Sequence, residues 1–177
     1  MAYYQVVSDE PFFRGIESED LERVKALEAA GYPADEAASP EGIEYRAKSA
    51  PGCFIVAIKP GDGGDEIVGF VNGTLATGDT LKHETMSQHD PDGELLCIHS
   101  VCVDENHRRT KVGSRMLKAY VNYVQQSTPQ AKRLILICKE TLIGFYDGCG
   151  FEMVGPSDVV HGREDWFEMK IDLGALI

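Results

Sequence analysis

The sequence has little positive charge. Its 17 lysines and arginines stand against 29 aspartates and glutamates, for a formal net charge of −12 over 177 residues. Sequence-independent binding to nucleic acid needs a basic surface that displaces counterions, and anionic membranes attract basic segments. We therefore expect no nucleic-acid partner and no membrane partner. An acidic surface suits a cationic substrate such as an amine, although the same charge also serves solubility alone.

Paired cysteine motifs and long apolar runs are missing as well. The five cysteines contain no Cys-x-x-Cys pair, and several lie in apolar runs where a thiol packs as a small hydrophobe. Neither a disulfide framework nor a metal site is expected. No run approaches the roughly 18 apolar residues of a membrane span, and the first ten residues do not have the pattern of a signal peptide. These absences predict a cytoplasmic protein.

Patterning along the chain indicates alternating strands and helices. Ser18 is expected to be the N-cap of a first helix and Ser39-Pro40 the start of a second, and a third helix is expected over residues 112–125. The expected strands cover residues 3–7, 53–58, 67–75, 94–103, 134–138, 151–154 and 166–172, with a short helix over 141–146. This order predicts a single α/β (α+β) domain over residues 1–177, in which a mixed central sheet is flanked by helices and residues 94–103 lie at its centre.

One turn has the composition of an anion site. Residues 108–114 read Arg-Arg-Thr-Lys-Val-Gly-Ser and open directly into the helix expected over 112–125. A helix N-terminus offers unpaired N–H groups and a partial positive charge, so it binds phosphate well. Arg108 and Arg109 would add charge-assisted hydrogen bonds. The alternative is a solvated basic turn, and neither a Walker loop nor a dinucleotide fingerprint is present.

This strand–turn–helix resembles the acetyl-CoA pyrophosphate motif of the GCN5-related N-acetyltransferases, Arg/Gln-x-x-Gly-x-Gly/Ala. Arg108 matches its first position and Gly113 its last, whereas Lys111 stands where the first glycine normally lies. The resemblance implies the fold of that family, with acetyl-CoA as cosubstrate and no metal. It assigns acetyl-CoA binding to Val101, Cys102, Val103, Arg108, Arg109, Thr110, Lys111, Val112, Gly113 and Ser114.

Two further segments extend the resemblance. Residues 145–151, FYDGCGF, resemble the family's Phe-Tyr-x-x-x-Gly-Phe element, whose tyrosine lies beside the cofactor sulfur. Residues 32–39, YPADEAAS, and 95–103, LLCIHSVCV, are similar to the non-vertebrate arylalkylamine N-acetyltransferases. The resemblance implies direct acetyl transfer to the primary amine of a small arylalkylamine of the serotonin, tryptamine or phenethylamine type. Tyr146 would then protonate the leaving thiolate, and a core aromatic is the alternative role for this residue.

Candidate residues for proton removal follow from the same resemblance. Vertebrate members carry two histidines on the strand, of which His99 matches the second, while Cys97 stands at the first. The resemblance implies that His99 is the catalytic base, and the alternative is a satisfied core histidine. Glu36 is the rival base or an ammonium-binding carboxylate. Ile137, Phe12 and Phe13 are candidate walls for an aromatic substrate.

Other functions remain compatible with these residues. The same chemistry can act on a polyamine, an amino sugar or a protein amine, and a non-catalytic acyl-CoA-binding sensor is a different class. The departures at Lys111 and Cys97 favour the sensor, whereas His99 and Tyr146 favour the enzyme. We expect a monomer or a weak homodimer with a small-molecule amine and acetyl-CoA as its partners.

Overall fold

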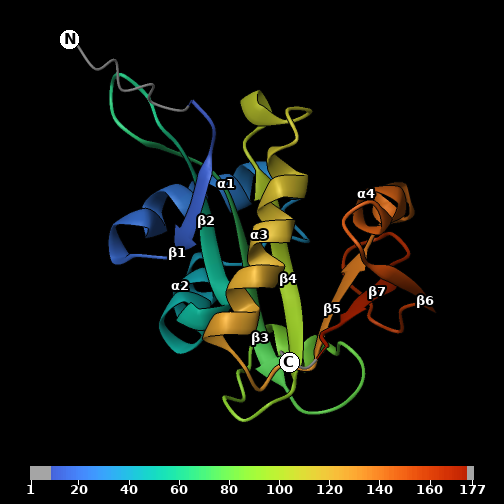
Figure 1. The fold of residues 1–177 in the computed structure, drawn as a ribbon. Coiled ribbons are helices and arrows are strands. Elements are labelled where there is room, and N and C mark those ends of the chain that lie inside the picture. Colours follow the sequence, from blue (N-terminus) through green and yellow to red (C-terminus); the bar gives the residue numbers. More distant parts are fainter. Residues whose placement is uncertain (1–8, 175–177) are drawn as a thin grey trace.

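A mixed sheet of seven strands runs through residues 9–174, the part of the chain that this computed structural model describes (Figure 1). Its order is β1-β2-β3-β4-β5-β7-β6, so that β4 is central, as expected. The strands are β1 (Phe12–Gly15), β2 (Phe54–Lys59), β3 (Glu66–Ala76), β4 (Leu95–Val103), β5 (Arg133–Cys138), β6 (Glu152–Pro156) and β7 (Phe167–Asp172). Only the β4–β5 pair is parallel, and the other neighbours are antiparallel.

The helices lie on the two faces of this sheet. They are α1 (Leu21–Gly31), α2 (Pro40–Ser49), α3 (Val112–Ser127) and the short α4 (Ile143–Asp147). α3 packs on one face, and α1 and α2 pack on the other (Figure 1). The predicted α/β fold with a mixed sheet between helices is therefore confirmed. The extent of the domain over residues 1–177 stays a prediction, and the strand expected over residues 3–7 lies outside the described residues.

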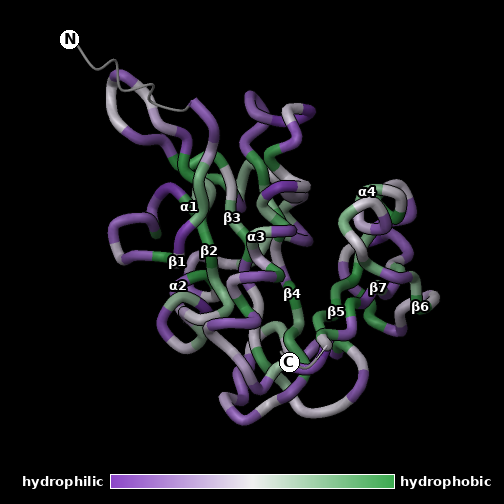
Figure 2. The backbone as a smooth tube through the Cα atoms, in the orientation of Figure 1, coloured by the Kyte–Doolittle hydropathy of each residue, from purple (hydrophilic) through white to green (hydrophobic). Residues whose placement is uncertain are grey.

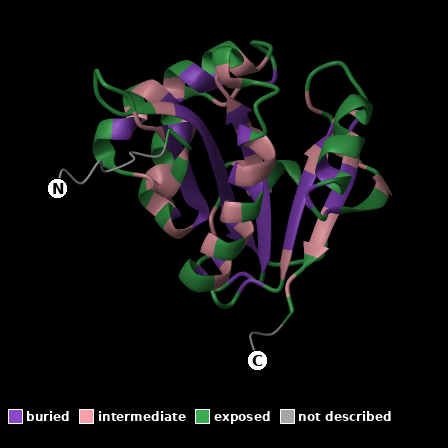
Figure 3. Cartoon of the chain, turned by 45° about the horizontal axis from the view of Figure 1, so that its top comes forward, coloured by how far each residue is buried: buried purple, intermediate pink, exposed green. Residues whose placement is uncertain are grey.

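The two larger clusters of buried apolar side chains lie on opposite faces of the sheet, and a smaller third one includes Cys97 and Ile135. Met116, Leu117, Tyr120 and Val124 of α3 form the first with the sheet, and Tyr120 also donates a hydrogen bond to the Cys53 carbonyl at 2.9 Å. The second lies between α1, α2 and strands β2 and β3. Strands β2, β3 and β4 are apolar along most of their length and largely buried (Figures 2 and 3). This packing fixes the position of β4 from both sides.

The helix starts test the expected caps. Ser39 Oγ accepts a hydrogen bond from the Gly42 N–H at 3.1 Å, which confirms the predicted start of α2. The prediction for Ser18 is wrong, because a 3₁₀ turn begins at that residue and its N-cap is Glu17. The cause is Asp20, whose buried carboxylate accepts from the Glu17 N–H at 2.8 Å and pairs with Arg14 at 2.7 Å.

Two irregularities of β4 shape the site. Parallel pairing with β5 covers Leu95–Cys97 only, and the two strands then diverge (Figure 1). On the other edge, Asn72 pairs with Ser100 and Gly73 with Ile98, so that His99 is the extra residue of a β-bulge. Gly73 permits the close approach there, because a Cβ at this position would lie 2.6 Å from the Cys97 carbonyl oxygen.

None of the helices in residues 9–174 is long and apolar enough to span a membrane.

Candidate active site

A cavity of about 530 Å³ lies where β4 and β5 have diverged, and it extends toward the α1–α2 connection. Its wall contains eight of the residues that the sequence analysis selected: Glu36, His99, Val101, Cys102, Val103, Arg108, Ile137 and Tyr146. The wall does not include the rest of the predicted anion-binding turn, which continues beyond Arg108 as Arg109, Thr110, Lys111, Val112, Gly113 and Ser114. The predicted catalytic pair and the predicted substrate-binding residues thus share one cavity.

His99 has a hydrogen-bond arrangement that fixes its tautomer. Thr74 Oγ1 lies 2.7 Å from His99 Nε2 and donates its one proton to the Thr85 carbonyl at 2.7 Å. Nε2 must therefore carry the imidazole proton and donate it to Thr74. This leaves Nδ1 as a basic nitrogen, which is buried and has no hydrogen-bond partner among residues 9–174.

The charge state of His99 follows from its surroundings. Burial lowers the pKa of His99 well below the usual imidazole value, and the nearby Arg46 guanidinium lowers it further. Arg46 is itself only 6% exposed and donates to the Met86 carbonyl at 3.0 Å and to Asn72 Oδ1 at 3.2 Å. At neutral pH the imidazole is thus uncharged and has a free lone pair, as a general base requires.

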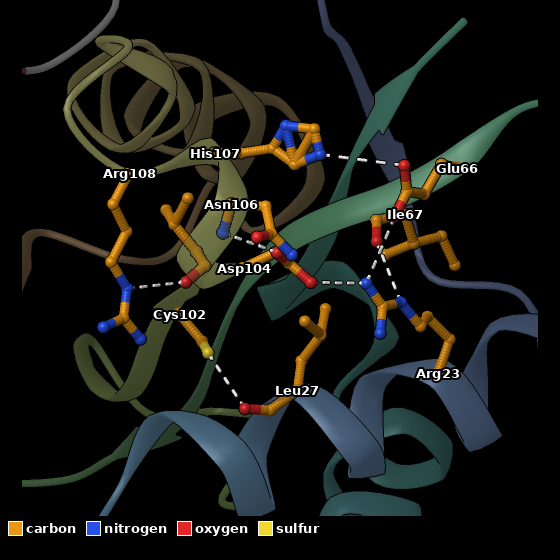
Figure 4. Close-up of polar contacts among 10 residues, drawn as sticks. Arg23, Leu27, Glu66, Ile67, Cys102, Asp104, Asn106, His107 and Arg108 are labelled. Carbon is orange, nitrogen blue, oxygen red and sulfur yellow. Dashed lines mark hydrogen bonds and ion pairs between the residues drawn. The ribbon is translucent and has the colours of Figure 1, made fainter. Parts of the chain in front are cut away.

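Backbone groups of β4 face the gap at alternate residues. The Tyr32 hydroxyl accepts from the Val101 N–H and donates to the Val101 carbonyl, each at 2.9 Å. Arg108 Nε donates to the Val103 carbonyl at 3.1 Å (Figure 4). Because the backbone polar groups of successive strand residues point to opposite sides, those of Cys102 face β3.

The expectation that Cys102 offers its N–H to a cofactor therefore needs correction, because this residue does not present its backbone to the gap. Its thiol, on the α1 side of the sheet, donates to the Leu27 carbonyl at 3.2 Å (Figure 4). Burial raises the pKa of the Cys102 thiol to about 12, and likewise that of Cys97. A reactive cysteine needs a lowered pKa, so neither thiol is prepared as a nucleophile.

The turn before α3 is held from the α1 side. Asp104 accepts from the Asn106 N–H at 2.9 Å, and its other carboxylate oxygen lies 2.7 Å from Arg23 of α1 (Figure 4). The backbone hydrogen bond from Asn106 and the Arg23 charge keep the pKa of Asp104 below its ordinary value. Arg109 and Lys111 have φ of 64° and 65°, and Lys111 is the N-cap of α3. Two basic side chains thus flank the free N–H groups of a helix start.

Glu36 belongs to a cluster that joins three connections, α1–α2, β5–α4 and β6–β7. Its Oε1 lies 2.9 Å from Lys139 Nζ, and the same ammonium also pairs with Glu164. The Glu36 carbonyl lies 2.9 Å from His161 Nε2, so residue 36 is held against the β6–β7 connection. Its second carboxylate oxygen, Oε2, is buried and has no hydrogen-bond partner within the described residues.

The β5 side of the cavity carries Ile137 and Tyr146. Ile137 is half-buried, while Phe12 and Phe13, the other expected walls, lie on the edge strand β1 and outside the cavity wall, which corrects that expectation. Tyr146 of α4 is 7% exposed, and its ring packs edge-on against Phe151 at a centroid distance of 5.7 Å. Burial raises the pKa of Tyr146 far above that of a free phenol, so its hydroxyl stays protonated.

The model of the acetyltransferase (GNAT) family matches residues 20–151, which include β4, the turn before α3 and Tyr146. The chain belongs to this acetyltransferase family. Two curated relatives are the serotonin N-acetyltransferases of Mesocricetus auratus and Macaca mulatta, which are 31% and 29% identical over 107 residues. Those residues are 60% of this chain, and they cover 51% and 52% of the two relatives, about half their length.

Solved structures share the fold of this acetyltransferase at lower identity. A GNAT-like decarboxylase, GphF, in complex with isobutyryl-CoA has a TM-score of 0.75 and 20% identity, covering 91% of this chain and 98% of its own. NAA60 of Arabidopsis thaliana in complex with acetyl-CoA has a TM-score of 0.69 and 17% identity, covering 92% and 98%. These similarities support the α/β fold.

Several residues in or next to the cavity were not identified from the sequence. Thr74 sets the tautomer of His99, Tyr32 binds the β4 backbone, and Lys139 neutralises Glu36. Arg46 did leave a sequence signal, since it follows Ile43 by three residues on the buried face of α2. The other contacts join residues far apart in sequence and have no local pattern.

The acetyltransferase offers no metal centre in its described part, because residues 9–174 contain no group of three or more His, Cys, Asp or Glu side chains placed to hold an ion.

The left-handed conformation of Lys111 explains why the family pattern has glycine there. A non-glycine residue at this φ is strained, since its Cβ crowds the backbone. We predict that Lys111→Gly stabilises the protein by about 0.5–1 kcal/mol in urea unfolding. Lys111→Ala removes the same charge but keeps the strain, so its expected change is smaller. Equal changes in the two variants would show that strain at this position is not the cause.

Proposed function

We propose that this acetyltransferase transfers the acetyl group of acetyl-CoA directly to the primary amine of a small arylalkylamine such as serotonin, tryptamine or phenethylamine. The observation that carries the proposal is the pairing, in one cavity, of a neutral imidazole with a free nitrogen and a protonated tyrosine hydroxyl. The similarity to serotonin N-acetyltransferases, at 31% identity, supports the substrate class. His99 and Tyr146 are the proposed catalytic residues.

The chain's own groups fit acetyl-CoA. Beyond the point where β4 and β5 stop pairing, the backbone groups of Val101 and Val103 face the gap between the two strands. The amide groups of the CoA arm can pair with them as a neighbouring strand would. The Tyr32 hydroxyl now bonds to Val101, so an arm that pairs there takes the place of that hydroxyl. We assign the pyrophosphate to the free N–H groups at the start of α3, which include those of Val112, Gly113 and Ser114.

Basic side chains strengthen this phosphate site. Arg108, Arg109 and Lys111 lie in the turn that precedes α3, and Thr110 closes it with a hydrogen bond from its hydroxyl to the His107 carbonyl at 2.5 Å. Arginine forms charge-assisted bonds to phosphate oxygens, and the helix dipole adds to that attraction. The contribution of Cys102 is packing against α1 rather than a hydrogen bond to the cofactor.

The proposed reaction has one proton transfer on each side of the bond change. An alkylammonium has a pKa near ~10, so His99 Nδ1 must first take its proton, directly or through water. The amine nitrogen then forms a bond to the thioester carbonyl carbon. The Val101 N–H, once it is released from the Tyr32 hydroxyl, stabilises the carbonyl oxygen. The carbon–sulfur bond breaks, its electron pair stays on sulfur, and Tyr146 protonates the thiolate. The nitrogen then loses its second proton, which reaches the Tyr146 phenolate through solvent and restores the hydroxyl. The products are an N-acetyl amine and free CoA, and His99 releases the first proton to solvent.

Glu36 and Ile137 are the proposed substrate-binding residues. Ile137 provides an apolar wall on β5 for an aromatic ring. Glu36 already shares the charge of Lys139, which suits a positioning carboxylate better than a base, so we assign the base to His99. The buried Oε2 of Glu36 can accept a hydrogen bond from the amine substrate.

Turnover tests the proposed function. We expect the wild type to release CoA thiol from acetyl-CoA with tryptamine or phenethylamine at low millimolar concentration, and more slowly with spermidine. Preferential turnover of spermidine would keep the chemistry and contradict the substrate class. Binding of acetyl-CoA without turnover of any amine, including a histone-like peptide, would favour the acyl-CoA sensor.

A pH profile tests the base. Because the pKa of His99 lies below the ordinary ~6.5, the imidazole stays neutral down to that pH, and kcat/KM should fall only at lower pH, as Nδ1 becomes protonated. His99→Gln is expected to lower kcat by roughly 10²-fold and to abolish this acid limb. Glu36→Gln should keep the acid limb. An acid limb that persists in His99→Gln and disappears in Glu36→Gln would make Glu36 the base.

A further inference from the structure

Glu28 is a buried carboxylate that the reaction described above does not use. It lies on the sheet-facing side of α1, is 3% exposed, and contributes to the wall of the cavity. Its Oε1 accepts a hydrogen bond from the Ala38 N–H at 2.8 Å. Its Oε2 is buried and has no hydrogen-bond partner among residues 9–174. One oxygen of this carboxylate is thus fixed by the protein, and the other is left without a donor.

No cation forms an ion pair with Glu28 in the described part of the chain. Two other buried carboxylates do have such partners, since Asp20 pairs with Arg14 at 2.7 Å and Glu36 with Lys139 at 2.9 Å. Arg46 favours the ionised form of Glu28 only from beyond ion-pair distance, and it donates to Met86 and Asn72 instead. A buried charge without a partner destabilises a protein. We therefore expect a cationic ligand in the cavity to pair with the Glu28 carboxylate.

The position of Glu28 relative to the base is favourable for an amine. Burial raises the pKa of Glu28, and the Ala38 N–H, the nearby Ser100 side chain and the Arg46 charge each oppose that rise. Three buried acceptors of this cavity wall have no donor among residues 9–174, namely Glu28 Oε2, His99 Nδ1 and Glu36 Oε2. An alkylammonium group carries a positive charge and three N–H donors. It can therefore donate a hydrogen bond to Glu28 Oε2 and another to His99 Nδ1, neither of which has a donor in the described part of the protein.

We propose that Glu28 binds the ammonium group of the amine substrate, supplies its counter-charge and positions its nitrogen at His99. This assignment rests on the proposed function and adds the residue that recognises charge. Glu36 is the weaker candidate for this role because it already has an ion-pair partner in Lys139, which it shares with Glu164. The cavity should accordingly prefer a cationic arylalkylamine to a neutral molecule of the same shape.

The test compares tryptamine with tryptophol, in which a neutral hydroxyl replaces the amino group, in binding titrations of the whole chain. The wild type should bind tryptamine roughly ten-fold or more tightly than tryptophol, and Glu28→Gln should bring the two affinities close together. Glu22→Gln is the matched control, since Glu22 is an exposed glutamate of the same helix, and it should keep the wild-type preference. This comparison measures binding, so it judges Glu28 whether or not the amine is turned over.

Thermal unfolding separates this role from a structural one. Glutamine keeps an acceptor for Ala38 and removes an unpaired buried charge, so Glu28→Gln should unfold at an equal or higher temperature than the wild type. Where turnover is found, the KM for tryptamine should rise by roughly ten-fold and the KM for acetyl-CoA should not change. An unaltered preference for tryptamine in Glu28→Gln, or loss of that preference in Glu36→Gln alone, overturns the proposal.

Discussion

Parallel pairing between β4 and β5 stops at Cys97, and this early end of pairing creates the space on which the rest of the site depends. Beyond that residue the backbone groups of Val101 and Val103 no longer have a strand partner on the β5 side. They bond instead to the Tyr32 hydroxyl and to Arg108. Buried backbone groups rarely remain unpaired, so these side chains occupy positions that a ligand's amide groups can take. The same divergence opens the cavity that contains His99 and Tyr146.

The buried charged residues in the wall of this cavity are held in different ways. Glu36 pairs with Lys139, whereas Arg46 donates to Asn72 and to the Met86 carbonyl. Burial, and after it the positive charge of Arg46, lowers the pKa of His99 and keeps it uncharged. The cavity wall thus contains an imidazole that is neutral at physiological pH and a tyrosine that is protonated, the two groups to which we assign the proton transfers. Opposed protonation states of this kind are what acyl transfer to an amine requires, since one proton must leave the nucleophile and another must reach the thiolate.

Local sequence predicted the parts of the fold that depend on neighbouring residues. The apolar run of β4, the amphipathic period of α3 and the Ser39-Pro40 start of α2 all act within a few positions, and each was placed within one or two residues of its observed bounds. Ser18 was misplaced because a pair between Asp20 and Arg14, from the preceding strand, decides where the first helical turn begins.

The site was predicted only in outline for the same reason. His99 and Tyr146 were found through the family resemblance, whereas the bulge that sets His99 apart depends on Gly73 of the neighbouring strand. The hydrogen bonds of Tyr32 join residues 69 positions apart, and those of Arg46 to Met86 join residues 40 apart. Such contacts form only when the sheet and helices have packed together.

The most direct test of the central claim is a titration of the isotopically labelled protein with CoA, followed through its backbone amide resonances. If the unpaired edge of β4 receives the CoA arm, the amide signals of Val101 and Val103 and those at the start of α3 shift together, while the Cys102 amide, which faces β3, shifts less. If CoA binds and these resonances stay in place, the gap between β4 and β5 is not the cofactor site.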